Sequence, residues 1–425
     1  MGVQFDGDPH DMIDHSLDEL AALVASAGGE VVGRVVQRRT KPDAATFIGK
    51  GKAAELTEEV QRLHADTTVV DQELSPAQLR NLEETISGKV IDRTILILDL
   101  FAQRAQSMEG KKQVELAQLA YGLPRLRGWG EALSRIGAGA AGGGGGRAPI
   151  GTRGPGETQL EIDRRRIERR LTKLRRELTT LSKQRALRRK RREQSVPTVS
   201  LVGYTNAGKS TLLNHLTDAG VVTEDRLFST LDPTARRLEL PGGRSVVLTD
   251  TVGFIRKLPH GLVEAFKSTL EEVGMADVLV NVVDASRAEP EADTAAVDEV
   301  LAEIGATEAP RVLALNKVDL LGDAERARVQ RRFPDAVEIS AATGEGVEAL
   351  LAEVERHLEA RVIEVEALLP YAEGTLLNRL HDDGRVVRSE HEAGGVRVLV
   401  RARTADLGVL ERFLVAPPSG DTART

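Results

Sequence analysis

Residues 203–211 read GYTNAGKST, which places two glycines, a lysine and a hydroxyl residue at the spacing G-x-x-x-x-G-K-[ST]. Such a loop curls its backbone N–H groups around phosphate oxygens, and its glycines let the backbone approach without a Cβ in the way. Lys209 is expected to reach the β- and γ-phosphates, and Ser210 to ligate Mg²⁺. The phosphate-binding residues predicted here are Gly203, Tyr204, Thr205, Asn206, Ala207, Gly208, Lys209, Ser210 and Thr211.

A second motif, Asp250-Thr251-Val252-Gly253, follows a predicted strand at residues 246–248. An aspartate at a strand end beside a phosphate loop can hold a Mg²⁺-bound water, and Gly253 can donate its N–H to the γ-phosphate. Loss of that phosphate would release the residues that follow, which is how a switch behaves. The candidate for the first switch is residues 228–233 (FSTLDP). Its Thr230 would close on Mg²⁺ and the γ-phosphate, and the alternative is Thr234, the residue after this segment.

The base-binding candidate is residues 316–319 (NKVD), which follow a predicted buried strand at 312–315. Asp319 would accept from N1–H and the 2-amino group of guanine, whereas adenine would leave this carboxylate unpaired. Asn316 is expected to tie this loop to the phosphate loop, and backbone N–H groups after the next strand can reach guanine O6. Four motifs in this order predict a GTP or GDP site. Its base side comprises Asn316, Lys317, Val318, Asp319, Ser340, Ala341 and Ala342.

The residue that many GTPases use to orient the attacking water is not at its usual place, because Phe254 follows Gly253. His260 lies farther along and is better explained as a loop histidine, and no arginine finger is evident. Turnover is therefore expected to be slow until a partner orders the switches. Asn206 either braces the phosphate loop or helps to hold K⁺ beside the β- and γ-phosphates, and the sequence leaves both roles open.

The whole chain must position these motifs, and its 425 residues predict about two to four domains. The absence of cysteine excludes disulfides, zinc–thiolate sites and thiol catalysis, and it suits a cytoplasmic protein. No run approaches the ~18 apolar residues that cross a bilayer, and the N-terminus lacks an apolar signal region. We therefore expect a cytoplasmic protein with no membrane span.

Charge is distributed very unevenly along the chain. The net charge is −7, yet residues 161–193 hold 15 Lys or Arg against 5 Asp or Glu, so this segment carries +10 and the remainder −17. Because aromatic residues make up only 3% of the chain, contact with RNA phosphates is expected rather than base stacking. The alternative is a solvated face with i,i+4 pairs. The candidate RNA contacts are Arg188, Arg189, Lys190, Arg191 and Arg192, with Arg147 and Arg153 in a glycine-rich segment.

The basic segment also carries an apolar seam. Its members recur at spacings of four and three and are Ile167, Leu171, Leu174, Leu178 and Leu181. They predict one half of an antiparallel helical arm, made of residues 102–135 and 158–192. A capping box at Thr158 and Glu161 would start the second helix, and the glycine-rich residues 137–156 would form the tip.

The predicted fold class is α/β, with a P-loop GTPase domain, an N-terminal α/β domain, the helical arm and a small C-terminal α+β domain. The predicted domains are 1–103, 104–194 (arm), 195–365 (GTPase) and 366–425, the last with a disordered tail from residue 417. Predicted N-terminal elements are strands 30–38 and 67–71 and helices 52–64 and 75–86. Predicted C-terminal elements are helices 374–380 and 405–414 and a hairpin of strands 386–391 and 396–401. In the N-terminal region, after the predicted strand at 30–38, residues 47–52 (FIGKGK) form either a phosphate or RNA contact or a solvated loop.

Together with FIGKGK, EGKKQVELAQL and GPGETQLE-DRR, these motifs resemble the HflX family of ribosome-associated GTPases over residues 33–414. The resemblance implies an HflX-type N-terminal domain with an arm that docks on the large (50S) ribosomal subunit and its rRNA. It further implies a GTP-bound form that splits or rescues ribosomes under stress. By this likeness Thr230 is the Mg²⁺ threonine, and the nucleotide is lined by Phe228, Ser229, Thr230, Leu231 and Asp232.

Two other functions remain open from the sequence. One is an ATP-driven RNA or ribosome remodeller with a second nucleotide site near FIGKGK, although NKVD argues against ATP at the main site. The other is a small-molecule phosphotransferase, for which the sequence offers no substrate pocket. The absence of a second long apolar seam favours a monomer.

Overall fold

The computed structural model describes most of the chain. Outside the description lie residues 8–11, 127–158, 193–195, 218–226, 229–233, 257–261, 263–264, 267–269, 271–272, 308, 361, 383–385, 404–409 and 416–425. By their contacts, residues 1–184, 222–233 and 251–271 form one compact unit, and residues 185–221, 234–250 and 272–425 form the other. Each unit combines several separate stretches of the chain and does not correspond to a continuous domain. The four predicted domain ranges therefore stay a prediction.

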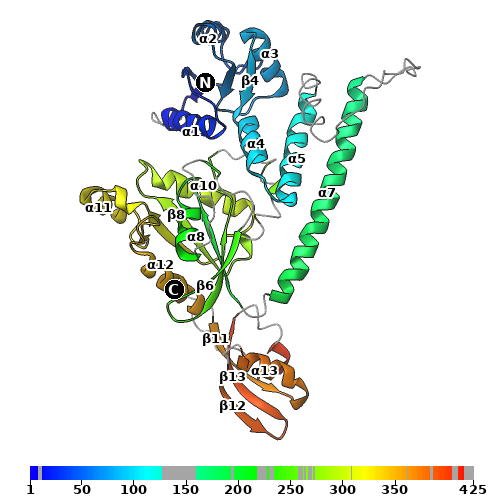
Figure 1. Ribbon diagram of the computed structural model, residues 1–425, viewed down its shortest axis with the longest axis vertical. Coiled ribbons are helices and arrows are strands. Elements are labelled where there is room, and N and C mark those ends of the chain that lie inside the picture. Colours follow the sequence, from blue (N-terminus) through cyan, green and yellow to red (C-terminus); the bar gives the residue numbers. More distant parts are fainter. Residues whose placement is uncertain are drawn as a thin grey trace. The chain divides into compact units, whose positions relative to one another are not determined.

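The N-terminal strands of the first unit are short and parallel (Figure 1). Two hydrogen bonds join the two strand pairs: the Met1 amino group donates to the Val69 carbonyl, and the Asp71 N–H donates to the Met1 carbonyl. The apolar core beneath them includes Val3, Ile48, Val70 and Leu82. The pairs are β1 (Gly2–Phe5) with β2 (Val36–Arg39), and β3 (Thr67–Val70) with β4 (Lys89–Asp92).

The predicted strand at 30–38 is wrong in its first half, because β2 begins only at Val36. Its partner β1 starts at Gly2, whose N–H donates to the Val35 carbonyl at 2.9 Å, and among the described residues no strand pairs with residues 30–35. The unpaired segment leaves Val31 and Val32 exposed. Strand pairing, which is a tertiary contact, therefore ended this strand earlier than its β-branched composition predicts.

Four helices pack on these strands: α1 (Met12–Ser26), α2 (Lys50–Leu63), α3 (Pro76–Ile86) and α4 (Arg93–Arg104). The predicted helices at 52–64 and 75–86 are confirmed as α2 and α3. Ser75 caps α3 by accepting from the Gln78 N–H, and Pro76 occupies the first turn. The sequence did not predict α1 and α4. Helix α4 buries side chains around much of its circumference, which weakens the one-sided pattern that reveals a surface helix.

Asp92 connects the strands, α4 and the base of the arm. One carboxylate oxygen accepts from the Ile95 N–H at 2.9 Å and caps α4, and the other accepts from the Leu74 N–H at 3.1 Å. The Tyr121 hydroxyl also donates to Asp92, and Arg125 stacks on the Tyr121 ring. Burial and the neighbouring carboxylate raise the pKa of Tyr121, so this phenol stays protonated and remains a donor.

The arm consists of α5 (Met108–Gly122), a short helix η1 (Leu123–Arg125) and the long helix α7 (Gln159–Arg192). Lys112 pairs with Glu177, and Glu115 pairs with Arg170. Because the numbers rise along α5 as they fall along α7, the two helices are antiparallel, as predicted. The predicted seam is confirmed: Leu181 is partly buried, and the buried members are Ile167, Leu171, Leu174 and Leu178. The predicted capping threonine Thr158 and the glycine-rich tip lie outside the described residues.

The second unit contains a six-stranded sheet in the order β10-β9-β8-β5-β7-β6, in which only β6 is antiparallel to its neighbour. Strand β8 is buried at every residue, as expected for the middle of a parallel sheet. The predicted strands at 198–202, 246–248 and 312–315 are confirmed. The strands are β5 (Thr198–Gly203), β6 (Thr234–Glu239), β7 (Ser245–Asp250), β8 (Val278–Asp284), β9 (Arg311–Asn316) and β10 (Val337–Glu338).

Helices α8 and α12 share one apolar core with this sheet, built from residues such as Val199, Leu212, Val280 and Leu350. The crossover helices place the carboxyl ends of β5, β8 and β9 along the same edge of the sheet, where ligands bind in such folds. The helices of this part are α8 (Lys209–Thr217), α10 (Pro290–Glu303), η2 (Val318–Leu320), α11 (Asp323–Arg332) and α12 (Val347–Ala360).

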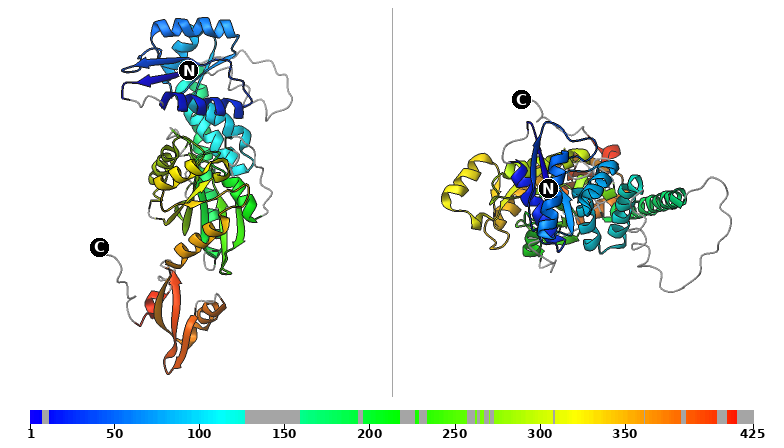
Figure 2. Two further views of the ribbon diagram at one scale, coloured as in Figure 1. Left: turned by 90° about the vertical axis from the view of Figure 1, so that its left-hand side faces the viewer. Right: turned by 90° about the horizontal axis from the view of Figure 1, so that it is seen from above.

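The C-terminal sheet is antiparallel with the order β11-β13-β12, and α13 (Gly374–Asp382) shares its apolar core (Figure 2). The predicted helix at 374–380 and the hairpin are confirmed by α13, β12 (Val386–Glu392) and β13 (Gly395–Arg403). Short helices η3 (Tyr371–Glu373) and η5 (Glu411–Phe413) follow β11 and β13. Of the predicted helix at 405–414, residues 404–409 lie outside the description.

Strand β11 (Val362–Leu369) was not predicted, and it pairs along its whole length with β13. It crosses the predicted boundary at 365. We therefore propose that the C-terminal domain begins directly after α12. Among the described residues, no helix has both the length and the apolar character needed to cross a membrane.

Replacement of Leu174 by alanine should loosen the arm, because this side chain is fully buried at the centre of the seam. The loss of a buried leucine costs about 2–5 kcal/mol, and we expect most of it to appear as faster amide hydrogen exchange in α5 and α7. Thr179→Ala, at an exposed position of α7, is the control. Equal exchange in both variants would contradict a seam that holds the arm together.

Candidate functional site

The phosphate loop joins β5 to α8 and depends on two glycines in left-handed conformations. Gly203 has φ 145° and Gly208 has φ 96°. A Cβ at Gly203 would lie 2.3 Å from the Val282 carbonyl oxygen, and one at Gly208 would lie 2.2 Å from Nδ2 of Asn316. Neither position can carry a side chain without moving a neighbouring loop, so the backbone itself forms the cradle.

Lys209 is buried at the centre of this loop, where its ammonium donates to the carbonyls of Gly203 at 3.1 Å and Tyr204 at 2.8 Å. Burial lowers the pKa of Lys209 to about 8, and the Asp250 carboxylate opposes this shift. The ammonium is thus held in place by backbone oxygens before any phosphate arrives. A phosphate would favour the charged form further.

Asn316 links three segments of the site. Its Nδ2 donates to the Ala207 carbonyl at 2.7 Å, and its Oδ1 accepts from the Ala341 N–H at 2.9 Å. The side chain is buried, with a relative exposure of 2%. One amide therefore sets the position of the phosphate loop relative to both predicted base loops, 316–319 and 340–342.

Lys317, the residue after this amide, adopts a left-handed conformation with φ 66°, and its ammonium pairs with Asp284 at 2.7 Å. Asp319 lies in η2 with its side chain exposed, while Ser340 is fully buried. Sequence reasoning missed Asp284, although it ends the long apolar run at 278–284 in the same way that Asp250 ends β7. Its contact fixes the Lys317 side chain within the predicted base loop.

The two predicted switch segments are grouped with the first unit. Thr251, Val252 and Gly253 are buried there, and so is Phe254, the residue at the usual water-orienting position. Thr234 begins β6 and pairs with Asp250. His260 and five members of the first switch lie outside the described residues; those members are Ser229, Thr230, Leu231, Asp232 and Pro233.

Phe228 is the one described residue of the five that were predicted to line the nucleotide. Its side chain is only 1% exposed and packs edge-on against Phe101, with ring centroids 4.7 Å apart. Its ring is therefore covered by another aromatic side chain, and burial of this kind stabilises the fold. That Phe228 lines the nucleotide stays a prediction.

The donors predicted for Mg²⁺ fit that ion. Ser210 Oγ donates to Asp250 Oδ2 at 2.7 Å, and both residues are buried. Mg²⁺ prefers hard oxygen ligands and is usually held by one or two side chains together with phosphate oxygens and waters. Within the described residues, no group of three or more His, Cys, Asp or Glu side chains forms a separate metal site. We therefore propose that Ser210 ligates Mg²⁺ and that Asp250 holds it through a water, with Thr230, outside the described residues, as the second predicted ligand.

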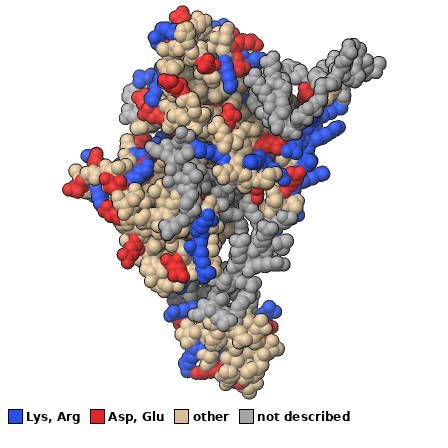
Figure 3. Space-filling view, viewed as in Figure 1, with Lys and Arg blue, Asp and Glu red and all other residues tan. Residues whose placement is uncertain are grey.

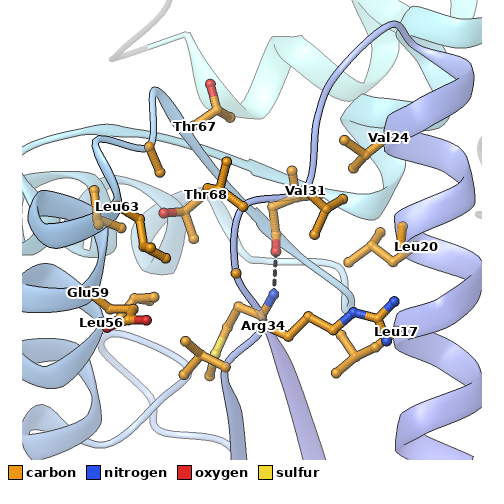
Figure 4. Close-up of a pocket in the computed structure, with 18 of the residues that line it drawn as sticks. Leu17, Leu20, Val24, Val31, Arg34, Leu56, Glu59, Leu63, Thr67 and Thr68 are labelled. Carbon is orange, nitrogen blue, oxygen red and sulfur yellow. Dashed lines mark hydrogen bonds between the residues drawn. The ribbon is translucent and has the colours of Figure 1, made fainter.

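The FIGKGK turn gives little support to a second nucleotide site. The Gly49 N–H donates to Gln37 at 3.0 Å, and Lys52 pairs with Glu55 at 2.6 Å. A pocket elsewhere in the N-terminal region, which none of residues 47–52 lines, has a volume of about 120 Å³ (Figure 4). Ligand sites usually measure roughly 300–1,000 Å³, so this pocket is too small for ATP. Its labelled lining residues are Leu17, Leu20, Val24, Val31, Arg34, Leu56, Glu59, Leu63, Thr67 and Thr68.

The predicted RNA-contact residues are only partly within the description. Residues 188–192 lie in α7, but their side chains are not described, and Arg147 and Arg153 lie outside the described residues. The described cationic residues of α7 lie earlier in the helix. Lys and Arg side chains gather along this helix in the view of Figure 3. Residues that line an open groove along α7 are Arg165, Glu168, Arg169, Thr172, Lys173, Arg176 and Glu177.

Comparison with protein-family models gives four consecutive matches. They are the GTP-binding GTPase N-terminal model at residues 14–102, the GTP-binding GTPase middle region at 104–192, the 50S ribosome-binding GTPase model at 198–317 and the HflX C-terminal domain at 325–422. The second match covers the arm and the third covers the phosphate loop, Asp250 and Asn316.

Curated relatives share this arrangement over nearly their full length. A protein named GTPase HflX from Caldanaerobacter subterraneus subsp. tengcongensis is 46% identical over 404 residues, covering 95% of this chain and 91% of the relative. GTPase HflX from Escherichia coli is 45% identical, covering 92% and 90%. Among solved structures, a GTP-binding protein from Sulfolobus solfataricus in complex with GDP matches with a TM-score of 0.42 and 24% identity over 84% of this chain and 97% of its own.

Replacement of Asp319 by asparagine should change the base that the site prefers. The asparagine NH₂ cannot accept from the guanine amino group, but it can donate to the 2-oxo group of xanthine. We expect GTP affinity to fall by about a hundredfold or more and xanthosine triphosphate affinity to rise, measured by equilibrium titration. Asp323→Asn removes the same charge four residues away and should leave both affinities unchanged. An Asp319→Asn variant that binds GTP normally would contradict the assignment of Asp319 to guanine recognition.

Proposed function

The chain belongs to the HflX family of GTPases and hydrolyses GTP, and we propose that it is a nucleotide-controlled ribosome factor. GTP would order its switches, the arm would engage rRNA on the large ribosomal subunit, and hydrolysis would release it. Splitting or rescue of ribosomes under stress is the outcome that this cycle would serve. We further propose that the protein acts in the cytoplasm as a monomer.

The observation that supports this proposal best is the charge on one face of α7. Arg165, Arg169 and Arg176 each precede a buried seam residue by two positions. Two positions correspond to about 200° around a helix, so these three cations lie opposite the seam. All three are exposed and, with Lys173, line the open groove along α7. A row of cations that faces solvent along one groove suits the phosphate backbone of RNA.

The acids on α7 are largely occupied by other contacts. Glu177 pairs with Lys112 of α5, and Glu168 pairs with Arg164. Arg169 and Arg176 have no ion pair among the described residues, as expected where bases outnumber acids threefold. This favours an external anion over a self-neutralised face, although exposed pairs contribute little in either case.

The chemistry of hydrolysis gives the ribosome a second role. Phe254 is buried and apolar, so it cannot orient the attacking water as a glutamine or histidine would. The chain's own residues bind and polarise the phosphates through the loop N–H groups, Lys209 and Ser210, while bound Mg²⁺ would neutralise the developing charge. We propose that contact with the ribosome orders the switches and so supplies the help in orienting water that the chain's own residues lack. Asn206 is exposed and left-handed, with φ 61°, and a K⁺ ion held beside it is a further proposal.

Phosphate release from GTP should be slow for the protein alone and should rise by roughly tenfold or more when isolated large ribosomal subunits are added. ATP should be turned over no faster with subunits than without them. Turnover that is indifferent to ribosomes would overturn the ribosome proposal and favour an ATP-driven remodeller. A comparison of K⁺ with Na⁺ buffer tests the K⁺ proposal, which equal rates in the two salts would remove.

Reversal of charge at Arg169 and Arg176, in a double Arg→Glu variant, should weaken binding to large subunits by about tenfold or more at physiological salt. The slope of log affinity against log salt should fall by about two, one for each lost phosphate contact. Arg328→Glu with Arg331→Glu makes the same charge change on the exposed side of α11 and serves as the control. Equal losses in the two double variants would show only a net-charge effect.

A further inference from the structure

Both switch segments are packed into the first unit by specific contacts with its helices. Residues 222–233 and 251–271 share that unit with α1 and α4. Every apolar residue described in the second segment is buried; these residues are Val252, Phe254, Ile255, Leu262, Ala265, Phe266 and Leu270. The described residues of the two switch segments therefore pack within the first unit.

The first switch segment is held at Leu227 and Phe228. The Leu227 N–H donates to Ser26 Oγ, at the end of α1, at 3.1 Å. The Phe228 ring meets Phe101 of α4 edge-on, at an interplanar angle of 90°. Phe228 also has φ 58°, a left-handed conformation that a bulky side chain rarely adopts. Such a conformation persists only where surrounding contacts hold it, and those contacts come from α1 and α4.

The second switch segment is held from the same helix. Phe101 also meets Phe266 edge-on, with ring centroids 5.1 Å apart. Arg93, at the start of α4, donates to the Arg256 carbonyl at 3.3 Å. The rings of Phe101, Phe228 and Phe266 are each at most 4% exposed, so the three form one buried aromatic cluster. Phe101 is the member that contacts both of the others.

The charge of Arg93, which donates to the Arg256 carbonyl, is balanced by two carboxylates. Its guanidinium pairs with Glu19 at 2.5 Å and with Asp71 at 2.9 Å, and all three side chains are buried. A buried cation with two buried carboxylates is costly to disturb, because removal of one partner leaves a charge without compensation. The guanidinium is thus a fixed point from which the backbone of the second segment is held.

We propose that Phe101 is a positioning residue that couples the two switch segments and so lets the N-terminal unit sense the γ-phosphate. Each segment meets Phe101 through an aromatic ring, so displacement of one segment removes a neighbour of the ring against which the other segment packs. In GTPases the γ-phosphate is bound by both switches, and GDP lacks it. Because the segments are packed here with α1 and α4, these contacts compete with the γ-phosphate for the same residues.

This inference rests on the GTPase activity and not on the ribosome proposal. A ligand shifts a conformational equilibrium only by the difference between its affinities for the two arrangements. GTP and GDP differ only in the γ-phosphate, so the ratio of their affinities reports the strength of the competition. General damage to the fold would weaken both nucleotides and leave the ratio unchanged.

The test is equilibrium titration of the full chain with fluorescent GDP and a non-hydrolysable GTP analogue, without ribosomes. Phe101→Leu removes both edge contacts and keeps an apolar side chain, and we expect the affinity ratio to shift toward the GTP analogue by about threefold to tenfold. Phe5→Leu removes an edge contact with Phe47 in the same unit, away from the switches, and should keep the wild-type ratio.

Ser26→Ala is a milder second variant, which removes the acceptor for the Leu227 N–H together with a hydrogen bond to the Ala22 carbonyl within α1, and it should shift the ratio in the same direction. It also decides the question if Phe101→Leu does not fold. In a Phe101→Leu, Phe228→Leu double variant, the two shifts should not add, because each removes the same contact. An unchanged ratio in Phe101→Leu, or a shift toward GDP, would overturn the proposal whatever the ribosome assays show.

Discussion

The buried amide of Asn316 is the interaction on which the nucleotide site depends. It donates to the phosphate loop at Ala207 and accepts from Ala341, so two loops from different strand ends share one side chain. The close approach is possible only because Gly208 has no Cβ, which would collide with the same amide. Phosphate binding and base recognition are therefore joined by geometry, and neither loop can move far without the other.

The same principle operates on a larger scale in the N-terminal unit. Asp92 and Arg93 are adjacent in sequence and make different contacts. Asp92 accepts from Tyr121 at the base of the arm, and Arg93 donates to the Arg256 carbonyl in the second switch segment. A short buried segment thus connects the arm with the part of the chain that responds to nucleotide.

Several features were accessible to sequence reasoning because they depend on local spacing. The phosphate loop, the strands before Asp250 and Asn316, the seam from Ile167 to Leu178 and the cap at Ser75 are all set by neighbours within a few residues. Other features were not accessible. Strand β2 starts late because β1 is short, β11 exists because β13 pairs with it, and α4 carries apolar side chains around much of its surface.

The sequence by itself determined the chemistry, because a phosphate loop, a guanine-selective aspartate and a cationic helix each require particular residue types at particular spacings. Only the tertiary structure decided which contacts those residues make. Phe228 was expected to line the nucleotide, yet its ring packs on Phe101, a residue more than a hundred positions earlier. Residues so far apart in the chain carry no mutual spacing signal, and their contact follows from burial of the two switch segments against α1 and α4.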